Sequence, residues 1–406
     1  MTPHRYSVAD AYDMVVLQPT TLCNLDCGYC YLPDRKVRRD MTPAIAGRVA
    51  ADVAVQVGRT ERAPVTALWH GGEPTATPLP QFERLLAEFE PLRQCGQLVH
   101  AIQTNATLIN EAWVDLLKRY GFQVSVSIDG PPDLDAERVT RGGRPAHDAI
   151  VRGIRLLKAG GLEVRSICVI TAASAHRAAE IIGYLDGLGL TSVGINLEEA
   201  EGISVDRPML DYATARRVWA DVLTYYRDTP GAPDRFGIRE LKLLSQFLHD
   251  GRSVRRDPLP TVMWNGDVVL LSPELAGIKS DTYGDFVAGN ILDESIQSIL
   301  ARRNSIRYVA EFDQALAACR ASCSYWSMCY GGYASNRYAE TGRLNVTETR
   351  HCRITRQALV DTAHELADPV RDAGMRRALA PLLSSGTGRG RPTTDGERCT
   401  DGQADA

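Results

Sequence analysis

Three cysteines near the start of the chain have a spacing that suits metal binding. Cys23, Cys27 and Cys30 lie in the run PTTLCNLDCGYCYL, where three thiols fall within eight residues as C-x3-C-x2-C. Three thiolates on one loop can hold three corners of a cubane iron–sulfur cluster and leave the fourth iron open for a chelating ligand. The alternatives are a zinc site, which needs a fourth ligand and usually shows paired C-x2-C knuckles, or a trio without metal. The spacing favours a reactive iron–sulfur cluster.

A second group of cysteines lies near the other end of the sequence. Cys319, Cys323 and Cys329 follow the pattern C-x3-C-x5-C, and Cys352 comes after a long loop. Four thiolates can close a cluster completely, although four cysteines are also a common structural zinc set. Both interpretations predict a region that needs metal to fold.

The remaining lone cysteines carry no such pattern. Cys95, Cys168 and Cys399 have no cysteine near them in the sequence. We expect the first two to be buried apolar residues and the third to be a thiol of a C-terminal tail.

Composition places few limits on the partners of the protein. The chain of 406 residues is 44% hydrophobic and 24% charged, so it can bury a large core. Its formal charge of −4 provides no overall basic field for nucleic acid or an anionic membrane. Neither a signal-peptide pattern nor a membrane-spanning apolar run occurs. We therefore expect a soluble cytoplasmic protein with reduced cysteines and no nucleic-acid or membrane partner.

The elements that must position the cysteines alternate along the first half of the chain. Short β-branched runs predict strands at 14–18, 65–69, 97–104, 123–128, 163–170 and 192–196, with helical patterns at 43–57, 79–89, 111–120, 148–159 and 176–188. Six βα units indicate an α/β fold, a partial (β/α)6 TIM-like barrel. In barrels of parallel strands the chemistry lies at the C-terminal strand ends, so the residues after each strand are the candidates.

The chain divides into three parts on this interpretation. Residues 1–235 form the barrel, and residues 236–383 form a smaller region with the second cysteine group. Helices at 212–228 and 238–249 bridge the two, and a turn-rich stretch covers 264–291. Residues 384–406 are rich in Gly, Ser, Thr, Asp and Arg without periodicity, which predicts a disordered tail.

The first cysteine loop, with the aromatic Tyr29 before its last cysteine, resembles the signature of radical S-adenosylmethionine (SAM) enzymes. The resemblance implies that the open iron of a 4Fe–4S cluster chelates the amino and carboxylate groups of SAM, and that Tyr29 lies near the adenine. Tyr29 could instead only pack the loop.

Further motifs after the next strands fit the same family. Gly71, Gly72 and Glu73 in WHGGEPTA match its GGEP motif, which the resemblance assigns to the amino group of SAM. Strand-end carbonyls and the Glu73 carboxylate can accept hydrogen bonds from an ammonium group.

The loops after the third and fourth strands carry polar residues that resemble family positions near the SAM ribose and carboxylate. Asn105 follows the third strand, and Ser127 and Asp129 end the fourth. Arg138 resembles the arginine that binds the SAM carboxylate, which suits its forked donors. Asn105 and Ser127 could instead be turn or cap residues. Four further side chains are weaker candidates: Arg141 and Arg144 as replacements for Arg138, and His70 and His147, which we expect to be structural.

Acidic residues follow the last predicted barrel strand. GINLEEAEG places Asn196, Glu198 and Glu199 at the expected substrate mouth. We take Glu199 as the catalytic carboxylate, which could deprotonate a substrate or hold a peptide backbone. The alternative is a solvated acidic turn.

The C-terminal cysteines resemble the SPASM extension of radical SAM peptide maturases, in which seven cysteines hold two auxiliary 4Fe–4S clusters. This chain departs from that pattern, because Tyr333 replaces one cysteine and no cysteine occurs at 264–274. The resemblance then implies one auxiliary cluster on the four thiols at positions 319, 323, 329 and 352, with His351 as a possible substitute ligand. The inner auxiliary cluster is expected to be absent.

The resemblance covers residues 12–365 and implies a reaction class. An electron, from a reductant such as flavodoxin or ferredoxin, reduces the first cluster, SAM is cleaved, and a 5′-deoxyadenosyl radical removes hydrogen from the substrate. The stretches VLLSPELAG, FVAGN and GGYASNRYAETGRLNVTE look most like maturases that join an aromatic ring to a neighbouring residue's β-carbon in a ribosomally made precursor peptide, giving a cyclophane.

Other functions remain open at this point. Thioether-forming (sactipeptide-type) and anaerobic sulfatase-type maturases belong to the same class, and the latter carry two auxiliary clusters. A radical SAM enzyme for a small metabolite, or a non-catalytic iron–sulfur or zinc protein, would belong to different classes. No separate leader-binding domain is evident in the sequence.

Overall fold

The computed structural model describes residues 7–59, 64–250 and 258–366 of the 406-residue chain. The predicted tail at 384–406, including Cys399, lies outside the described residues, as does the end of the second region at 367–383.

Six parallel strands form the centre of the structure, and they follow each other in sequence order across one sheet. They are β1 (Met14–Leu17), β2 (Val65–Trp69), β3 (Leu98–Thr104), β4 (Gln123–Ser127), β5 (Val164–Ile170) and β6 (Ser192–Leu197). Each predicted strand is confirmed to within one residue at either end. The mixed α/β fold with a parallel sheet agrees with the expected partial TIM-like barrel.

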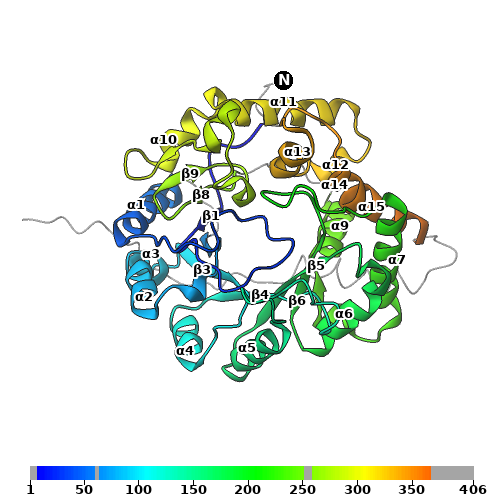
Figure 1. The fold of residues 1–406 in the computed structure, drawn as a ribbon. Coiled ribbons are helices and arrows are strands. Elements are labelled where there is room, and N and C mark those ends of the chain that lie inside the picture. The colour runs from blue at the N-terminus through cyan, green and yellow to red at the C-terminus, as the bar shows by residue number, and fades with distance from the viewer. Residues whose placement is uncertain (1–6, 60–63, 251–257, 367–406) are drawn as a thin grey trace, which may run out of the picture.

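Helices cover the outside of this curved sheet, as Figure 1 shows. They are α1 (Pro43–Arg59), α2 (Leu79–Ala87), α3 (Glu90–Gln94), α4 (Glu111–Arg119), α5 (His147–Ala159) and α6 (Ala178–Gly187). Their apolar faces pack on the strands. In the core, the Trp69 ring meets Phe82 edge-on at 5.0 Å between centroids and donates from Nε1 to His100 Nδ1 at 3.1 Å. Asn110 caps α4 by accepting from the Trp113 backbone NH.

Four short strands extend the sheet beyond the six. β7 (Gly237–Ile238) pairs with β6, and β8 (Thr261–Val262) pairs in parallel with β1. β9 (Asp267–Val269) and β10 (Gly289–Asn290) continue antiparallel from β8, so the strand order is β10-β9-β8-β1-β2-β3-β4-β5-β6-β7. The turn-rich stretch at 264–291 therefore shares its sheet with the barrel, and the division at residue 235 stays a prediction.

The remaining helices lie mainly along the top and right of the ring in Figure 1, on the side between β6 and β1. Two of them, α7 (Tyr212–Asp228) and α9 (Arg239–Asp250), confirm the helices predicted at 212–228 and 238–249. The structure adds α8 (Ala232–Arg235), α10 (Ile296–Ala301), α11 (Arg307–Ser322), α12 (Trp326–Cys329), α13 (Ala334–Thr341), α14 (Arg350–Cys352) and α15 (Ala358–Leu366). Asp211 caps α7 through the Thr214 backbone NH at 2.7 Å.

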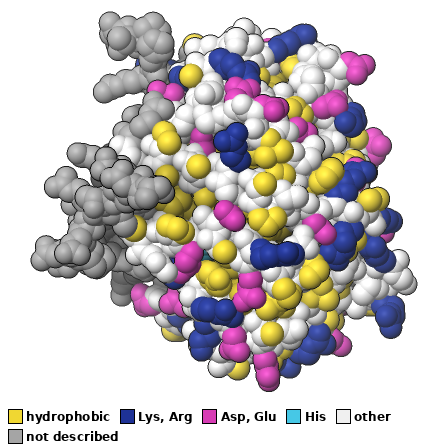
Figure 2. All heavy atoms as spheres, turned by 90° about the vertical axis from the view of Figure 1, so that its left-hand side faces the viewer, with side chains coloured by type: hydrophobic (Ala, Val, Ile, Leu, Met, Phe, Trp, Pro, Cys, Tyr) yellow, Lys and Arg dark blue, Asp and Glu magenta, His cyan; other side chains and the backbone are white. Residues whose placement is uncertain are grey.

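The surface carries no gathered charge on the face that Figure 2 presents, where acidic, basic and apolar side chains alternate. Among the described residues, no helix is both long and apolar enough to cross a membrane.

Candidate active site

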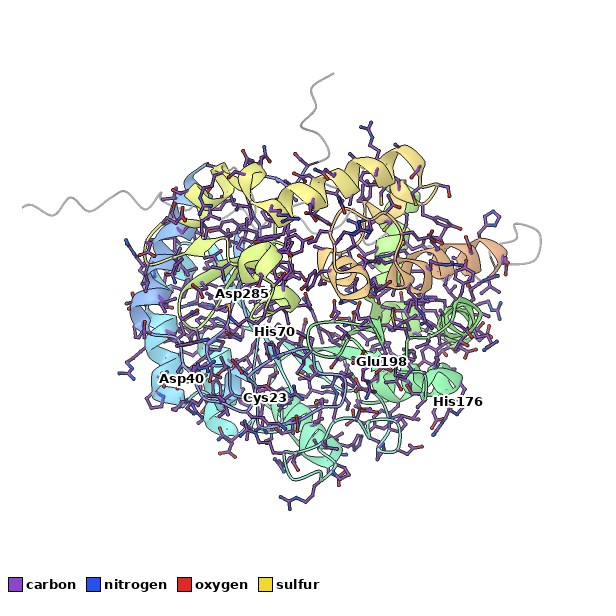
Figure 3. The ribbon with its side chains drawn as sticks, turned by 45° about the horizontal axis from the view of Figure 1, so that its top comes forward. Cys23, Asp40, His70, His176, Glu198 and Asp285 are labelled. Carbon is purple, nitrogen blue, oxygen red and sulfur yellow. The ribbon has the colours of Figure 1, made fainter. Side chains whose placement is uncertain are left out.

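Loops that follow the parallel strands line a cavity of about 240 Å³. The predicted site residues around it are Cys23, Cys27, Tyr29, Cys30, Gly72, Glu73, Asn105, Ser127, Arg138 and Glu199. Cys23, His70 and Glu198 lie toward the middle of the ring of strands, while His176 lies at its rim (Figure 3). Of the residues that the resemblance places near SAM, Gly71 and Asp129 do not line the cavity.

The cysteine loop is held by contacts with its neighbours. The Cys23 NH donates to the Arg35 carbonyl at 2.8 Å, and the Gly28 NH donates to the Glu137 carbonyl at 3.1 Å. Arg141 donates to the carbonyls of Cys23 and Arg35, both at 3.0 Å. Arg141, offered above as a replacement for Arg138, therefore binds the backbone of the cysteine loop.

The electrostatics of the three thiols favour a positively charged ligand. Burial raises the pKa of Cys23 and Cys30, and it raises the pKa of Cys27 to about 11. Iron ions would supply the charge that makes three enclosed thiolates stable, so the donor set fits a cluster. No three His, Cys, Asp or Glu side chains in the described ranges converge to hold a single metal ion. A cubane does not need that arrangement, because each thiolate binds its own iron.

The GGEP loop packs directly on the cysteine loop. Gly72 has a φ of +78°, and a Cβ there would lie 2.3 Å from the Thr20 carbonyl oxygen. Only glycine therefore lets the GGEP backbone pack this closely against the segment that leads into the cysteine loop. Glu73, only 2% exposed, accepts from the NH and hydroxyl of Thr75, the Thr104 hydroxyl and the Asn105 NH at 2.6–3.0 Å. Its Oε2 accepts only one of these bonds and keeps a lone pair for a ligand.

Asn105 and Ser127 have partners of their own in the cavity wall. Asn105 Nδ2 donates to Asn24 Oδ1 at 2.9 Å, and its Oδ1 accepts from the Thr107 NH and hydroxyl. Ser127 Oγ accepts from Gln103 Nε2 at 2.8 Å. Asn105 thus joins the cysteine loop to the end of β3. Its bonds to Thr107, two residues later, agree with the alternative that Asn105 is a turn residue.

Tyr29 and Arg138 meet on one buried carboxylate. Asp129 accepts from the Tyr29 hydroxyl at 2.5 Å and from Arg138 Nη2 at 2.9 Å, and the guanidinium lies 5.4 Å from the centre of the Tyr29 ring. Asp135 lies on the other side of Arg138, 3.6 Å from its Nε. Burial, then the Asp129 charge, raise the pKa of Asp135 to about 7. Arg138 therefore reaches the cavity already paired with Asp129.

The acidic residues after β6 have different environments. Asn196 Oδ1 accepts from Arg239 Nη2 at 2.8 Å, and the buried Glu198 pairs with Arg207 Nε at 2.5 Å. Glu199 Oε2 accepts from Asn336 Nδ2 at 2.5 Å and lies 2.5 Å from His351 Nδ1. The His351 contact is not aligned as a hydrogen bond. Glu199 therefore lies in the cavity wall against the C-terminal region, and the alternative of a solvated turn is wrong for it.

The two candidate histidines take structural partners. His70 Nε2 lies 2.9 Å from the Tyr31 hydroxyl, and burial lowers the pKa of His70 to about 4. His70 lines the cavity as a neutral ring. His147 lies away from the site, with Nε2 2.8 Å from the Tyr184 hydroxyl.

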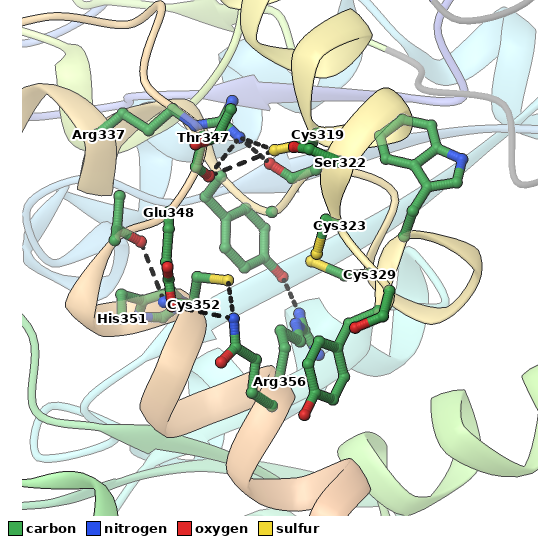
Figure 4. A pocket seen from close by; sticks show the side chains of 18 residues that line it. Cys319, Ser322, Cys323, Cys329, Arg337, Thr347, Glu348, His351, Cys352 and Arg356 are labelled. Atoms are coloured by element: carbon green, nitrogen blue, oxygen red, sulfur yellow. Dashed lines mark hydrogen bonds between the residues drawn. The ribbon is translucent and has the colours of Figure 1, made fainter.

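The four C-terminal cysteines line a second cavity of about 220 Å³. Figure 4 shows Cys319, Cys323, Cys329 and Cys352 around this space, which agrees with the predicted grouping. The hydrogen bond to Cys329, followed by burial, raises the pKa of Cys352, so these two thiols lie close together. The donor set fits a cluster closed by four thiolates.

Arg337 is the charged residue that the structure adds to this second site. It is 2% exposed, and Nη2 donates to the Gly331 carbonyl at 2.7 Å and lies 3.4 Å from Cys319 Sγ. Its guanidinium lies 5.0 Å from the centre of the Phe312 ring. A buried cation beside thiols suits thiolates bound to a metal cluster.

Sequence reasoning missed two carboxylates and misjudged one cysteine. Glu201 and Glu274 line the barrel cavity with Glu199, although only the nearness of Glu201 to the LEE run could have signalled this. Cys168 is fully buried as expected, but Cys95 is exposed at the C-terminal end of α3.

Comparisons with known sequences agree with this geometry. The model of the radical SAM superfamily matches residues 17–185. An uncharacterised protein of Synechocystis is 32% identical over 362 residues, which cover 86% of this chain and 90% of the relative. The serine-type anaerobic sulfatase-maturating enzyme of Klebsiella aerogenes is 31% identical over 196 residues, 45% of this chain and about half (48%) of that enzyme.

Solved structures share the fold. The enzyme anSMEcpe with bound AdoMet aligns with a TM-score of 0.71 over 87% of this chain and 97% of that one, at 18% identity. Streptococcus suis SuiB bound to its precursor peptide SuiA aligns with a TM-score of 0.62 over 85% of this chain and 76% of that one, also at 18% identity. The strand-end cavity, the three thiols and the sequence match together show that the chain belongs to the radical SAM superfamily, whose cofactors are SAM and a 4Fe–4S cluster.

Proposed function

We propose that this enzyme modifies a ribosomally made precursor peptide by forming a C–C cyclophane between an aromatic ring and the β-carbon of a neighbouring residue. The observation that carries the proposal is a third cavity of about 500 Å³ between the two cysteine sites. It shares His70, Glu199 and Glu201 with the SAM cavity, and it shares Tyr333 and His351 with the C-terminal cysteine cavity. A space of this size can receive peptide side chains between the two sites.

The roles of the residues follow from their positions. Cys23, Cys27 and Cys30 would hold the cluster that, with SAM and an electron from flavodoxin or ferredoxin, supplies a 5′-deoxyadenosyl radical for hydrogen removal. Oε2 of Glu73 and the strand-end carbonyls would accept from the amino group of SAM, and Arg138 would face its carboxylate. Glu199 would take the proton that the aromatic ring loses when the new bond forms.

The C-terminal cysteines would hold one auxiliary 4Fe–4S cluster, on Cys319, Cys323, Cys329 and Cys352. All four thiols border one cavity, which supports a closed set of ligands. This site would accept the electron released by the product, so that the peptide loses two hydrogen atoms in total. We place the enzyme in the cytoplasm, where such electron carriers and reduced thiols occur.

The alternative supported by a specific observation is an anaerobic sulfatase-type maturase, because the sequence match to such an enzyme covers 45% of this chain. The replacement of one SPASM cysteine by Tyr333, and the absence of cysteine at 264–274, favour the cyclophane proposal over it. A thioether-forming maturase is the other alternative.

The test uses the reconstituted enzyme with SAM, a reductant and short peptides encoded by neighbouring genes. Mass spectrometry should show a product lighter by two hydrogen atoms, and NMR should show a bond between an aromatic carbon and a β-carbon. A cyclophane resists desulfurisation by nickel and does not react with hydrazines. A product cleaved by nickel would establish a thioether, and one trapped by hydrazine would establish the aldehyde of a sulfatase-type maturase.

A further inference from the structure

The chamber between the two cysteine sites has an uneven charge. We call the cavity of about 500 Å³ the acidic chamber, because five carboxylates and only two arginines line it: Asp13, Glu199, Glu201, Glu240 and Glu274 against Arg239 and Arg356. No lysine lies among its described lining residues. A cavity with this excess of carboxylates is suited to a cation.

The two arginines of the acidic chamber already have partners in its wall. Arg239 Nη2 lies 2.6 Å from Glu240 Oε1 and donates to Asn196 Oδ1 at 2.8 Å. Arg356 donates to the Tyr333 hydroxyl at 3.3 Å, and its guanidinium lies 5.7 Å from the centre of that ring. Among the described residues, no arginine or lysine forms an ion pair with Glu201 or Glu274.

Glu201 and Glu274 accept only from neutral groups. Glu201 Oε1 accepts from Ser335 Oγ at 2.9 Å and from Asn336 Nδ2 at 3.2 Å, and Glu274 Oε2 accepts from Ser272 Oγ. Burial, then Glu199 and Glu274, raise the pKa of Glu201 well above its ordinary value. A bound cation would relieve this repulsion.

A buried histidine gives the second sign of a ligand. His351 is 6% exposed and lines the chamber, and its Nε2 has no hydrogen-bond partner. Nδ1 lies 2.5 Å from Glu199 Oε2 but is not aligned for a hydrogen bond, so neither ring nitrogen has a hydrogen-bond partner among the described residues. A buried polar atom without a partner calls for a ligand, which the protein does not supply here.

We propose that Glu201, Glu274 and Nε2 of His351 bind the ammonium or guanidinium group of a lysine or arginine side chain of the peptide substrate. The inference rests on the proposed peptide-modifying function and names a residue type in its substrate. The cation would lie between the SAM cavity, which also contains Glu201 and Glu274, and the auxiliary site, which His351 borders. It would anchor the peptide close to the position of hydrogen removal.

A groove provides the approach for the rest of the peptide. It has a volume of about 350 Å³ and shares Glu274 and Ser335 with the acidic chamber. Val205, Ile278 and Tyr338 line it, so apolar residues beside the basic one would fit.

The test compares isosteric probes on the reconstituted protein with SAM. Isothermal titration calorimetry at low salt should show Nα-acetylarginine amide, Nα-acetyllysine amide or both binding at least roughly tenfold more tightly than the neutral Nα-acetylcitrulline amide. The relative affinities of the first two probes distinguish a guanidinium from an ammonium site. Glu201→Gln and Glu274→Gln should each reduce this preference to about unity, whereas Glu88→Gln, at an exposed position outside the chamber, should keep it.

Iron content and circular dichroism establish that each variant is folded. If a variant does not fold, the affinities of the wild-type enzyme for the charged and neutral amides still test the inference. Equal binding of the arginine and citrulline amides to wild type, or a preference that survives both substitutions, would overturn the inference. Formation of 5′-deoxyadenosine by the same wild-type preparation is measured separately. If no 5′-deoxyadenosine forms, the proposed function is refuted, whereas the measured affinities for the amides still stand.

Discussion

The two cysteine sites are built in different ways. The barrel thiols lie on one loop, which backbone hydrogen bonds, Arg141 and the GGEP loop already hold in place. The C-terminal thiols come from the ends of α11, α12 and α14 and the turn between them, with Arg337 as a buried support. The first site is an open three-ligand loop fixed by the protein, and the second is a set of four ligands that a cluster would draw together.

The largest expected effect breaks the barrel site. Cys27→Ala removes one of three ligands from a site with no spare thiol, so 5′-deoxyadenosine should fall to the level of a blank without enzyme. Liquid chromatography under anaerobic reduction measures the nucleoside. Cys168→Ala, which removes a buried thiol outside both sites, should keep producing it. Nucleoside formation by Cys27→Ala would show that this loop does not hold the reactive cluster.

The next effect weakens the second site alone. Arg337→Gln removes the buried cation beside Cys319, and it should reduce retention of the auxiliary cluster by roughly ten- to hundredfold, as loss of a supporting hydrogen bond does in other metal sites. Iron release to a chelator measures retention. Arg343→Gln, at an exposed position of the same region, is the control. Equal iron release from both variants would show that Arg337 does not support the auxiliary cluster.

Metal removal should separate the two regions. After iron chelation, backbone amides at 319–352 should exchange roughly tenfold faster or more, because the cluster would join these segments. Amides of the cysteine loop at 23–30 should change less, since protein contacts hold that loop. Hydrogen exchange with mass spectrometry reports both segments in one experiment, and equal acceleration would contradict the comparison.

The smallest effect concerns the buried carboxylates of the barrel site. The pKa of Asp135 is raised to about 7, above an unfolded value of ~3.9, so the folded state binds more protons between these pH values. Stability contributed by protonated Asp135 is present below pH ~4 and is lost as the pH rises toward 7. Asp135→Asn should reduce the fall in unfolding free energy between pH 5 and 7 by roughly 1–2 kcal/mol.

Urea unfolding of the metal-free protein at the two pH values measures this difference. Asp148→Asn, whose side chain is fully exposed on α5, should leave the pH dependence as it is in wild type. If Asp135→Asn has the same pH dependence of unfolding free energy as wild type, Asp135 is ionised over the whole range from pH 5 to 7.

The same contrast explains what the sequence could predict. The six long strands have clear β-branched patterns, and the cysteine spacings are specific, so strand bounds and thiol groupings were predictable. β7–β10 have two or three residues each, too few for a period. The contacts of Arg141, Glu201 and Glu274 join loops far apart in the chain, so only the folded structure brings them together.

Anaerobic quantification of iron, sulfide and zinc after reconstitution tests the central claim of two distinct cluster sites most directly. Wild type should contain about eight irons per chain, and the Cys23/Cys27/Cys30→Ala variant about four, with loss of 5′-deoxyadenosine. About four irons together with zinc in wild type would make the C-terminal site structural and contradict the account of an auxiliary cluster.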